Sequence, residues 1–120
     1  MSIQYLLDEN LPHLYREQLL RLKSDLTVWI IGDPGVPPKS TLDPEILIWC
    51  EQNKFILVTN NRASMPVHLA DHLSQNRHIP GIFVLRPKAS IGEIIDDLIL
   101  IDELGNPQDY QDCISHIPFI

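Results

Sequence analysis

Residues 3–12 read IQYLLDENLP, and this stretch decides the fold that the sequence predicts. Its first half, Ile3 to Leu7, is an almost wholly apolar run that ends abruptly at Asp8, Glu9 and Asn10. A run without strict polar alternation is typical of a strand buried on both faces, as in a parallel sheet covered by helices. Pro12 then suits the first turn of a helix, and apolar residues follow at helical spacing: Leu11, Leu14, Tyr15, Leu19 and Leu22.

The same alternation of strand and helix repeats down the chain. Three further apolar runs predict strands at 26–31 (LTVWII), 55–59 (FILVT) and 82–85 (IFVL), and the last residues, 113–120, predict an edge strand. Helices are expected between them at 43–53, at 65–75 and after Ser90. We therefore predict an α/β fold with three layers, α/β/α, around a mainly parallel central sheet of four to five strands.

Local signals place the helix ends and the buried faces. Asp43 followed by Pro44 predicts an N-cap and a first helical position. Ser90 and Glu93 have the spacing of a capping box. In the 65–75 helix the expected apolar face is Val67, Ala70 and Leu73, and the expected core also includes Trp29, Trp49 and Cys50.

Size and composition set broad limits. The 120 residues contain no linker-like tract, so we expect one domain over 1–120. A net charge of −7 argues against a protein that coats nucleic acid non-specifically, although a nuclease with an acidic metal site is compatible with it. The N-terminus lacks the pattern of a signal peptide, no apolar run is long enough to span a membrane, and two cysteines make no disulfide framework. These features predict a cytoplasmic protein.

Polar residues follow several of the predicted strands, and parallel strands bring their carboxyl ends to one edge of a sheet. This places a group of polar side chains together: Asp8, Glu9, Asn10, Asn60, Asn61, Arg62 and Arg86. Mg²⁺ and Mn²⁺ prefer oxygen ligands, including one or a few carboxylates. We expect Asp8 and either Asp43 or Glu45 as charged ligands, with a carbonyl oxygen from Asn61. Arg62, Arg86 and Lys88 are candidates to hold a phosphate backbone at the rim.

Four motifs carry a likeness to a known family: LLDENLP (6–12), DPEIL (43–47), ILVTNNR (56–62) and PGIFVLRP (80–87). Together they resemble the PIN-like domains related to the toxin nucleases of bacterial toxin–antitoxin pairs, over roughly residues 3–101. The resemblance implies a Mg²⁺- or Mn²⁺-dependent ribonuclease acting on single-stranded RNA, a cognate antitoxin and a homodimer. It implies catalytic roles for Asp8, Glu45 and Asn61, metal ligation by Asp8, Asp43, Glu45 and Asn61, and support from Glu9, Asn10, Thr59 and Asn60.

The sequence departs from the family pattern at two positions. Asn61 stands where the family usually has an aspartate, and Ala63 stands where a further acid is common. An amide in place of a carboxylate removes one negative charge, so divalent affinity should fall. The alternative reading is a PIN-like fold that has lost catalysis and serves as a binding or interaction module. Each residue also has a purely structural interpretation. The acids would stabilise the starts of helices, Asn61 would form hydrogen bonds with backbone groups in a turn, and the basic residues would be solubilising charges.

Two other interpretations, a response-receiver domain and a zinc site, fit the sequence less well. A separate expectation concerns dimerisation. A response-receiver domain also has acids after its first strand, but it needs an aspartate after its third strand, where this chain has Asn60 and Asn61. His68 and His72 have a spacing that can bind zinc, yet with no third ligand in sight we expect them on an exposed helix face. Dimerisation is expected to use apolar residues near the C-terminus: Ile117, Phe119 and Ile120.

Overall fold

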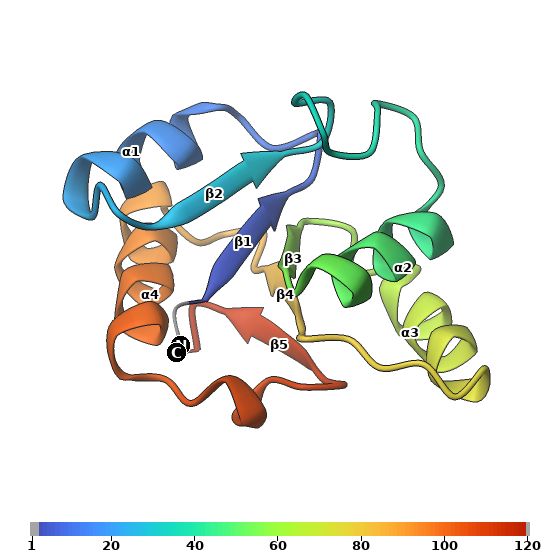
Figure 1. Ribbon diagram of the computed structural model, residues 1–120. Coiled ribbons are helices and arrows are strands. Elements are labelled where there is room, and N and C mark those ends of the chain that lie inside the picture. The colour runs from blue at the N-terminus through green and yellow to red at the C-terminus, as the bar shows by residue number, and fades with distance from the viewer. Residues whose placement is uncertain (1–2, 120) are drawn as a thin grey trace.

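The computed structural model describes residues 3–119, which form one parallel sheet between two pairs of helices. The chain alternates strand and helix from β1 to α4, and a short 3₁₀ helix then leads into β5 (Figure 1). The elements are β1 (Gln4–Leu7), α1 (Leu14–Leu22), β2 (Thr27–Ile30), α2 (Asp43–Asn53), β3 (Ile56–Thr59), α3 (Met65–Ser74), β4 (Ile82–Leu85), α4 (Ile91–Leu104), η1 (Pro107–Asp109) and β5 (Ile114–Ile117). The predicted α/β class and the predicted strands are confirmed.

The strand order is β2-β1-β3-β4-β5, and every neighbouring pair is parallel. From β1 the chain moves outward to β2, and it then crosses back to place β3 on the other side of β1. The strand order therefore reverses between β1 and β3. In open parallel sheets such a reversal opens a crevice at the carboxyl ends of the two strands.

The helices cover both faces of the sheet, which accounts for the apolar strands. Figure 1 shows α1 and α4 on one side and α2 and α3 on the other. The α1/α4 side packs against Tyr5 and Leu7, whereas the α2/α3 side packs against Leu6. Tyr5 is fully buried, and its hydroxyl donates a 2.7 Å hydrogen bond to the backbone carbonyl of Leu98 in α4. This three-layer architecture is compatible with a PIN-like fold.

The ends of α3 and α4 agree with the local signals to within one residue. At α1 the prediction was wrong, because the helix begins at Leu14 with His13 as its N-cap, so Pro12 precedes the helix instead of lying in its first turn. The capping box of Ser90 and Glu93 is present at the start of α4. At α2, however, the N-cap is Leu42, and Asp43 is the first helical residue instead of the cap. The predicted N-cap was therefore wrong by one position, because Pro44 is accommodated as the second residue of the first turn.

Three expectations about buried apolar residues were wrong, those for Val67 and Ala70 of α3, which are both exposed, and the one for Trp29 of β2. The buried residues of α3 are Met65, Leu69 and His72, whereas Val67 is 61% exposed. Trp29 is 41% exposed on β2, at the edge of the sheet, although its ring packs against that of Phe55.

The C-terminal apolar residues also differ from the expectation. Ile117 is completely buried in β5, so it cannot contribute to a dimer surface, while Phe119 is half exposed. Ile120 lies outside the described residues. None of the helices formed by residues 3–119 is long and apolar enough to cross a membrane.

Candidate functional site: a polar crevice at the carboxyl ends of β1 and β3

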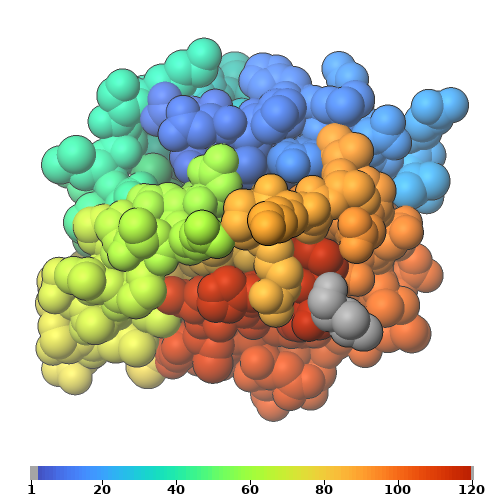
Figure 2. Space-filling model, turned by 180° about the vertical axis from the view of Figure 1, so that it is seen from behind, coloured from blue at the N-terminus to red at the C-terminus, as the bar shows by residue number. Residues whose placement is uncertain are grey.

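The candidate site lies where the strand order reverses. β1 leads into α1 on one face of the sheet, and β3 leads into α3 on the other. The backbone N–H of Asp8 donates to the carbonyl of Val58 at 2.9 Å. This bond keeps the ends of β1 and β3 together, although the segments that follow them lead to opposite faces of the sheet. Figure 2 shows the blue segment after β1, the lime-green segment after β3 and the orange segment after β4 on one face of the molecule.

Asp8 is a half-buried carboxylate held at both oxygens. Oδ1 accepts the backbone N–H of Glu9 at 2.8 Å, and Oδ2 accepts the hydroxyl of Thr59 at 3.0 Å. Burial raises the pKa of Asp8 above its usual range, and these two hydrogen bonds oppose that shift. The charges of Asp43 and Glu9 add to the increase of the pKa, so Asp43 acts electrostatically on Asp8. The two hydrogen bonds thus hold the Asp8 carboxyl group in a fixed position at the carboxyl end of β1.

Thr59 is the buried link between the two strands. It is 0% exposed, and its hydroxyl both donates to Asp8 and accepts the backbone N–H of Asn61 at 3.1 Å. A buried hydroxyl with both functions satisfied fixes the geometry of its partners. Thr59 therefore orients Asp8 and sets the turn that carries Asn61.

Asn61 connects this pair to α2 and α3. Its Nδ2 donates to Oδ2 of Asp43 at 3.2 Å and to Oγ of Ser64 at 2.7 Å, and its Oδ1 accepts the Ser64 N–H at 3.4 Å. Exchanging the amide oxygen and nitrogen would put an oxygen against a carboxylate and a donor against a donor, so the network fixes this orientation. The N–H₂ side of the amide, not its oxygen, faces Asp43.

The chemistry of the donors decides which residues fit a divalent cation. Within residues 3–119, no three histidine, cysteine or acidic side chains form a group that could hold a metal. Mg²⁺ needs only one or two carboxylates when it keeps several waters. Asp8 and Asp43 fit such a hydrated cation. Asn61, as oriented, offers that cation no oxygen.

The other predicted acids lie apart from this network. Glu45 is exposed, and its side chain makes no hydrogen bond or ion pair within the described part of the chain. It follows Asp43 by two positions, so it leaves the helix about 200° away. Glu9 accepts the backbone N–H of Ser40 at 2.8 Å, which ties the proline-rich loop to the end of β1.

The remaining predicted residues lie around the same edge. Asn10 and Asn60 are exposed beside the strand ends. Arg62 and Lys88 are also exposed, and Arg86 uses its Nε to donate to the carbonyl of Pro118 at 2.6 Å. The guanidinium of Arg86 is therefore anchored at one nitrogen and keeps donors for another partner.

The structure adds two residues that the sequence reasoning did not assign to the site, Ser64 and His68. Ser64 contacts Asn61, and Nε2 of His68 lies 3.5 Å from Oδ2 of Asp43. The spacing Asn61-x-x-Ser64 before a helix was the available signal for the first. His72 is buried, with Nε2 2.8 Å from the carbonyl of His78, so the expectation that it lies on an exposed face was wrong.

Comparisons of this chain with models of known protein families, with curated proteins and with solved structures find no match. The likeness to PIN-like domains therefore rests on the four motifs and on a compatible architecture. The function is therefore argued from the geometry of the residues around Asp8 and Asn61.

Proposed function

We propose that this chain is a Mg²⁺- or Mn²⁺-dependent ribonuclease of the PIN-like type, acting on single-stranded RNA. The observation that carries the proposal is the pair of carboxylates, Asp8 and Asp43, at the strand-order reversal. Thr59 and Asn61 connect them through hydrogen bonds. Parallel α/β sheets bind ligands in this crevice, and two carboxylates suit a hard cation.

In this proposal the side chains of the protein bind the cation and orient the RNA. When bound, the cation would supply an activated water and stabilise charge on the phosphate. Asp8, fixed by Thr59, and Asp43, at the start of α2, would hold it. Arg62, Arg86 and Lys88 would bind neighbouring phosphates of the RNA, a role that depends on ionic strength. The resemblance gives Glu45 a catalytic role, but its exposed position makes Asp43 the better candidate.

A second candidate function is a PIN-like binding module without catalysis. The specific observation in its favour is the Asn61 amide, which donates to Asp43 where the family pattern has a third acid. That contact gives the Asp43 carboxylate a hydrogen-bond donor without any cation. The two candidates make different predictions about the same variants.

Partners and compartment belong to the proposal as well. A cognate antitoxin would silence the ribonuclease, and a second copy of the chain would form a homodimer. We place the protein in the cytoplasm, where its two free cysteines, buried Cys50 and exposed Cys113, would stay reduced.

The test is RNA cleavage by purified full chain in Mn²⁺, Mg²⁺ or EDTA. The proposal predicts cleavage that requires metal and is lost in Asp8→Asn, with Glu45→Gln much less affected than Asp43→Asn. Inactivity of the natural chain, with cleavage restored by Asn61→Asp, would support the binding module instead. Inactivity of both proteins would contradict the ribonuclease.

A further inference from the structure

A cavity lies at the amino ends of the strands, on the opposite side of the sheet from Asp8 and Asn61. It has a volume of about 670 Å³ and is lined by residues at the amino ends of β1, β3 and β4 and by the segment around η1. Each of these strands has four residues and so spans about 13 Å, which separates the two sites. A volume of this size is in the range of small-molecule sites.

The floor of the cavity is apolar and rigid. Ile3, Ile56 and Ile79 line it and are at most 5% exposed, so they belong to the folded core. Pro80 and Pro107 add two rings with fixed backbone angles. A preformed apolar floor suits the face of a planar ring, because the ring loses water contact at little conformational cost.

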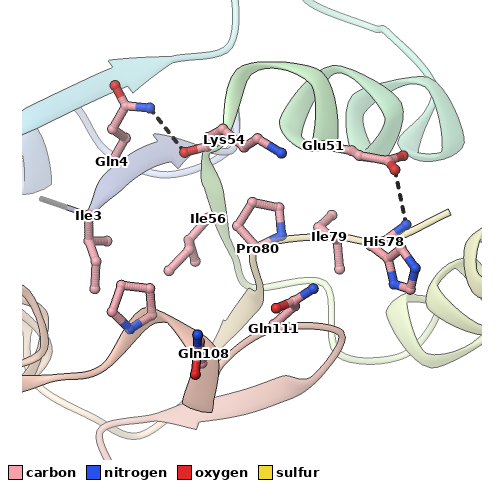
Figure 3. Close-up of a pocket in the computed structure, with 11 residues that line it drawn as sticks. Ile3, Gln4, Glu51, Lys54, Ile56, His78, Ile79, Pro80, Gln108 and Gln111 are labelled. Carbon is pink, nitrogen blue, oxygen red and sulfur yellow. Dashed lines mark hydrogen bonds between the residues drawn. The ribbon is translucent and has the colours of Figure 1, made fainter. Parts of the chain in front are cut away.

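The rim supplies amides on opposite sides. Figure 3 shows Gln4 and Lys54 on one side of the space and Gln108 and Gln111 on the other. Gln4 uses its Nε2 to donate to the carbonyls of Asn53 and Lys54 at 3.1 and 3.0 Å, which fixes the chain just before β3. Gln108 and Gln111 are exposed and make no side-chain hydrogen bond within residues 3–119. Free amides carry a donor and an acceptor side by side, as the edge of a nucleobase does.

The lining carries one acid and one lysine, and the lysine is the group that can pair with an anion, although the whole chain carries −7. The single acid of the lining, Glu51, is already engaged by the Nη1 of Arg77 at 3.3 Å and the backbone N–H of His78 at 3.0 Å. Lys54 forms no ion pair within residues 3–119. Its ammonium is therefore the uncommitted charge of the cavity, and a phosphate is a suitable partner.

We propose that this cavity binds a mononucleotide. The base lies on the rings of Pro80 and Pro107, above the buried isoleucines, its hydrogen-bonding edge meets the amides of Gln108 and Gln111, and its phosphate pairs with Lys54. This site goes beyond the proposed ribonuclease: it shares no residue with the crevice and requires no metal.

The test is an NMR titration of the ¹⁵N-labelled full chain in EDTA with 5′-AMP, 5′-GMP, 5′-CMP and 5′-UMP, each beside its nucleoside. We expect saturable shifts at Lys54, Ile79 and Gln108, and weaker binding of the nucleosides. Lys54→Met should weaken nucleotide binding about tenfold or more while leaving nucleoside binding unchanged. The control is Lys39→Met, the same change at an exposed lysine in another loop.

A second variant protects the test against a folding artefact. Gln111→Glu keeps the shape of an exposed side chain and adds a negative charge, so it should repel the nucleotide more than the nucleoside. No saturable shift with any nucleotide would overturn the proposal. So would shifts centred on Asp8 and Asn61, or equal effects of Lys54→Met and Lys39→Met. Because EDTA is present throughout, these outcomes are independent of the metal-dependent cleavage.

Discussion

The contacts of Asn61 allow an estimate of how much the replacement Asn61→Asp lowers the free energy of unfolding. The Asn61 amide donates to the Asp43 carboxylate and to Ser64, and the variant loses both donors. A hydrogen bond to a charged group contributes about 1.5–3 kcal/mol. Two like charges about 4 Å apart repel by about 4 kcal/mol at an effective dielectric constant of about 20. Solvent screens this partly exposed site, so we expect a loss of about 3 kcal/mol of unfolding free energy in EDTA.

The variant should be rescued by metal, because three carboxylates would then share one cation. Binding to the folded state at about a hundred times the Kd restores about 2.7 kcal/mol. The assay is urea unfolding of both proteins in EDTA and in saturating Mg²⁺. Asn76→Asp is the control, since it adds the same charge at an exposed position just beyond α3. Unchanged stability of Asn61→Asp in EDTA, or rescue no larger than that of the control, would refute the reasoning.

Three further predictions concern the buried polar contacts. Thr59→Val removes the donor to Asp8 and the acceptor for Asn61, so we expect a loss of about 2 kcal/mol by urea unfolding and a further rise of the Asp8 pKa in an NMR titration. An intact Asp8 titration in that variant would argue against the linkage. Because burial raises the Asp8 pKa in the folded state, its contribution is favourable below the unfolded-state pKa and is lost as the pH rises through the folded-state pKa. Asp8→Asn should therefore be more stable than the natural chain at neutral pH, and the difference should disappear in acid; a constant difference would be inconsistent with this sign. Tyr5→Phe should cost about 1 kcal/mol in thermal unfolding, because the carbonyl of Leu98 loses its buried phenol donor, and a neutral effect would mean that this bond adds nothing.

The fold could be predicted because each element carries its own local signal. The apolar runs of β1, β3 and β4 are continuous and bounded by polar residues or by Pro80-Gly81, so their type and order were readable. The face of α3 was not readable in this way. Its sequence contains several apolar residues, and the buried set of Met65, Leu69 and His72 includes a histidine whose Nε2 lies 2.8 Å from the His78 carbonyl and 3.2 Å from Oε1 of Glu51.

The position of the candidate site in the fold could be predicted from the sequence, but the contacts between its side chains could not. Parallel topology alone brings Asp8 and Asn61 to one edge of the sheet. The choice between Asp43 and Glu45 depends on the phase of α2, which a shift of its start by one residue alters. The direction of the Asn61 amide depends on Ser64 and Asp43 together. The spacing of Asn61 and Ser64 could have indicated the first contact, but no local pattern indicates the contact with Asp43, 18 residues away. The cavity at the amino ends of the strands also needs the turn around η1, which has no periodic signal.

The most direct test of the central claim is where a divalent cation binds. Mn²⁺ is paramagnetic, so at low occupancy it broadens the amide signals of nearby residues in the ¹⁵N-labelled chain. We predict selective broadening at Asp8, Asp43 and Asn61 that excess Mg²⁺ reverses and that Asp8→Asn abolishes. Broadening spread over the exposed acids, or no selective broadening at all, would contradict a metal-dependent function for this crevice.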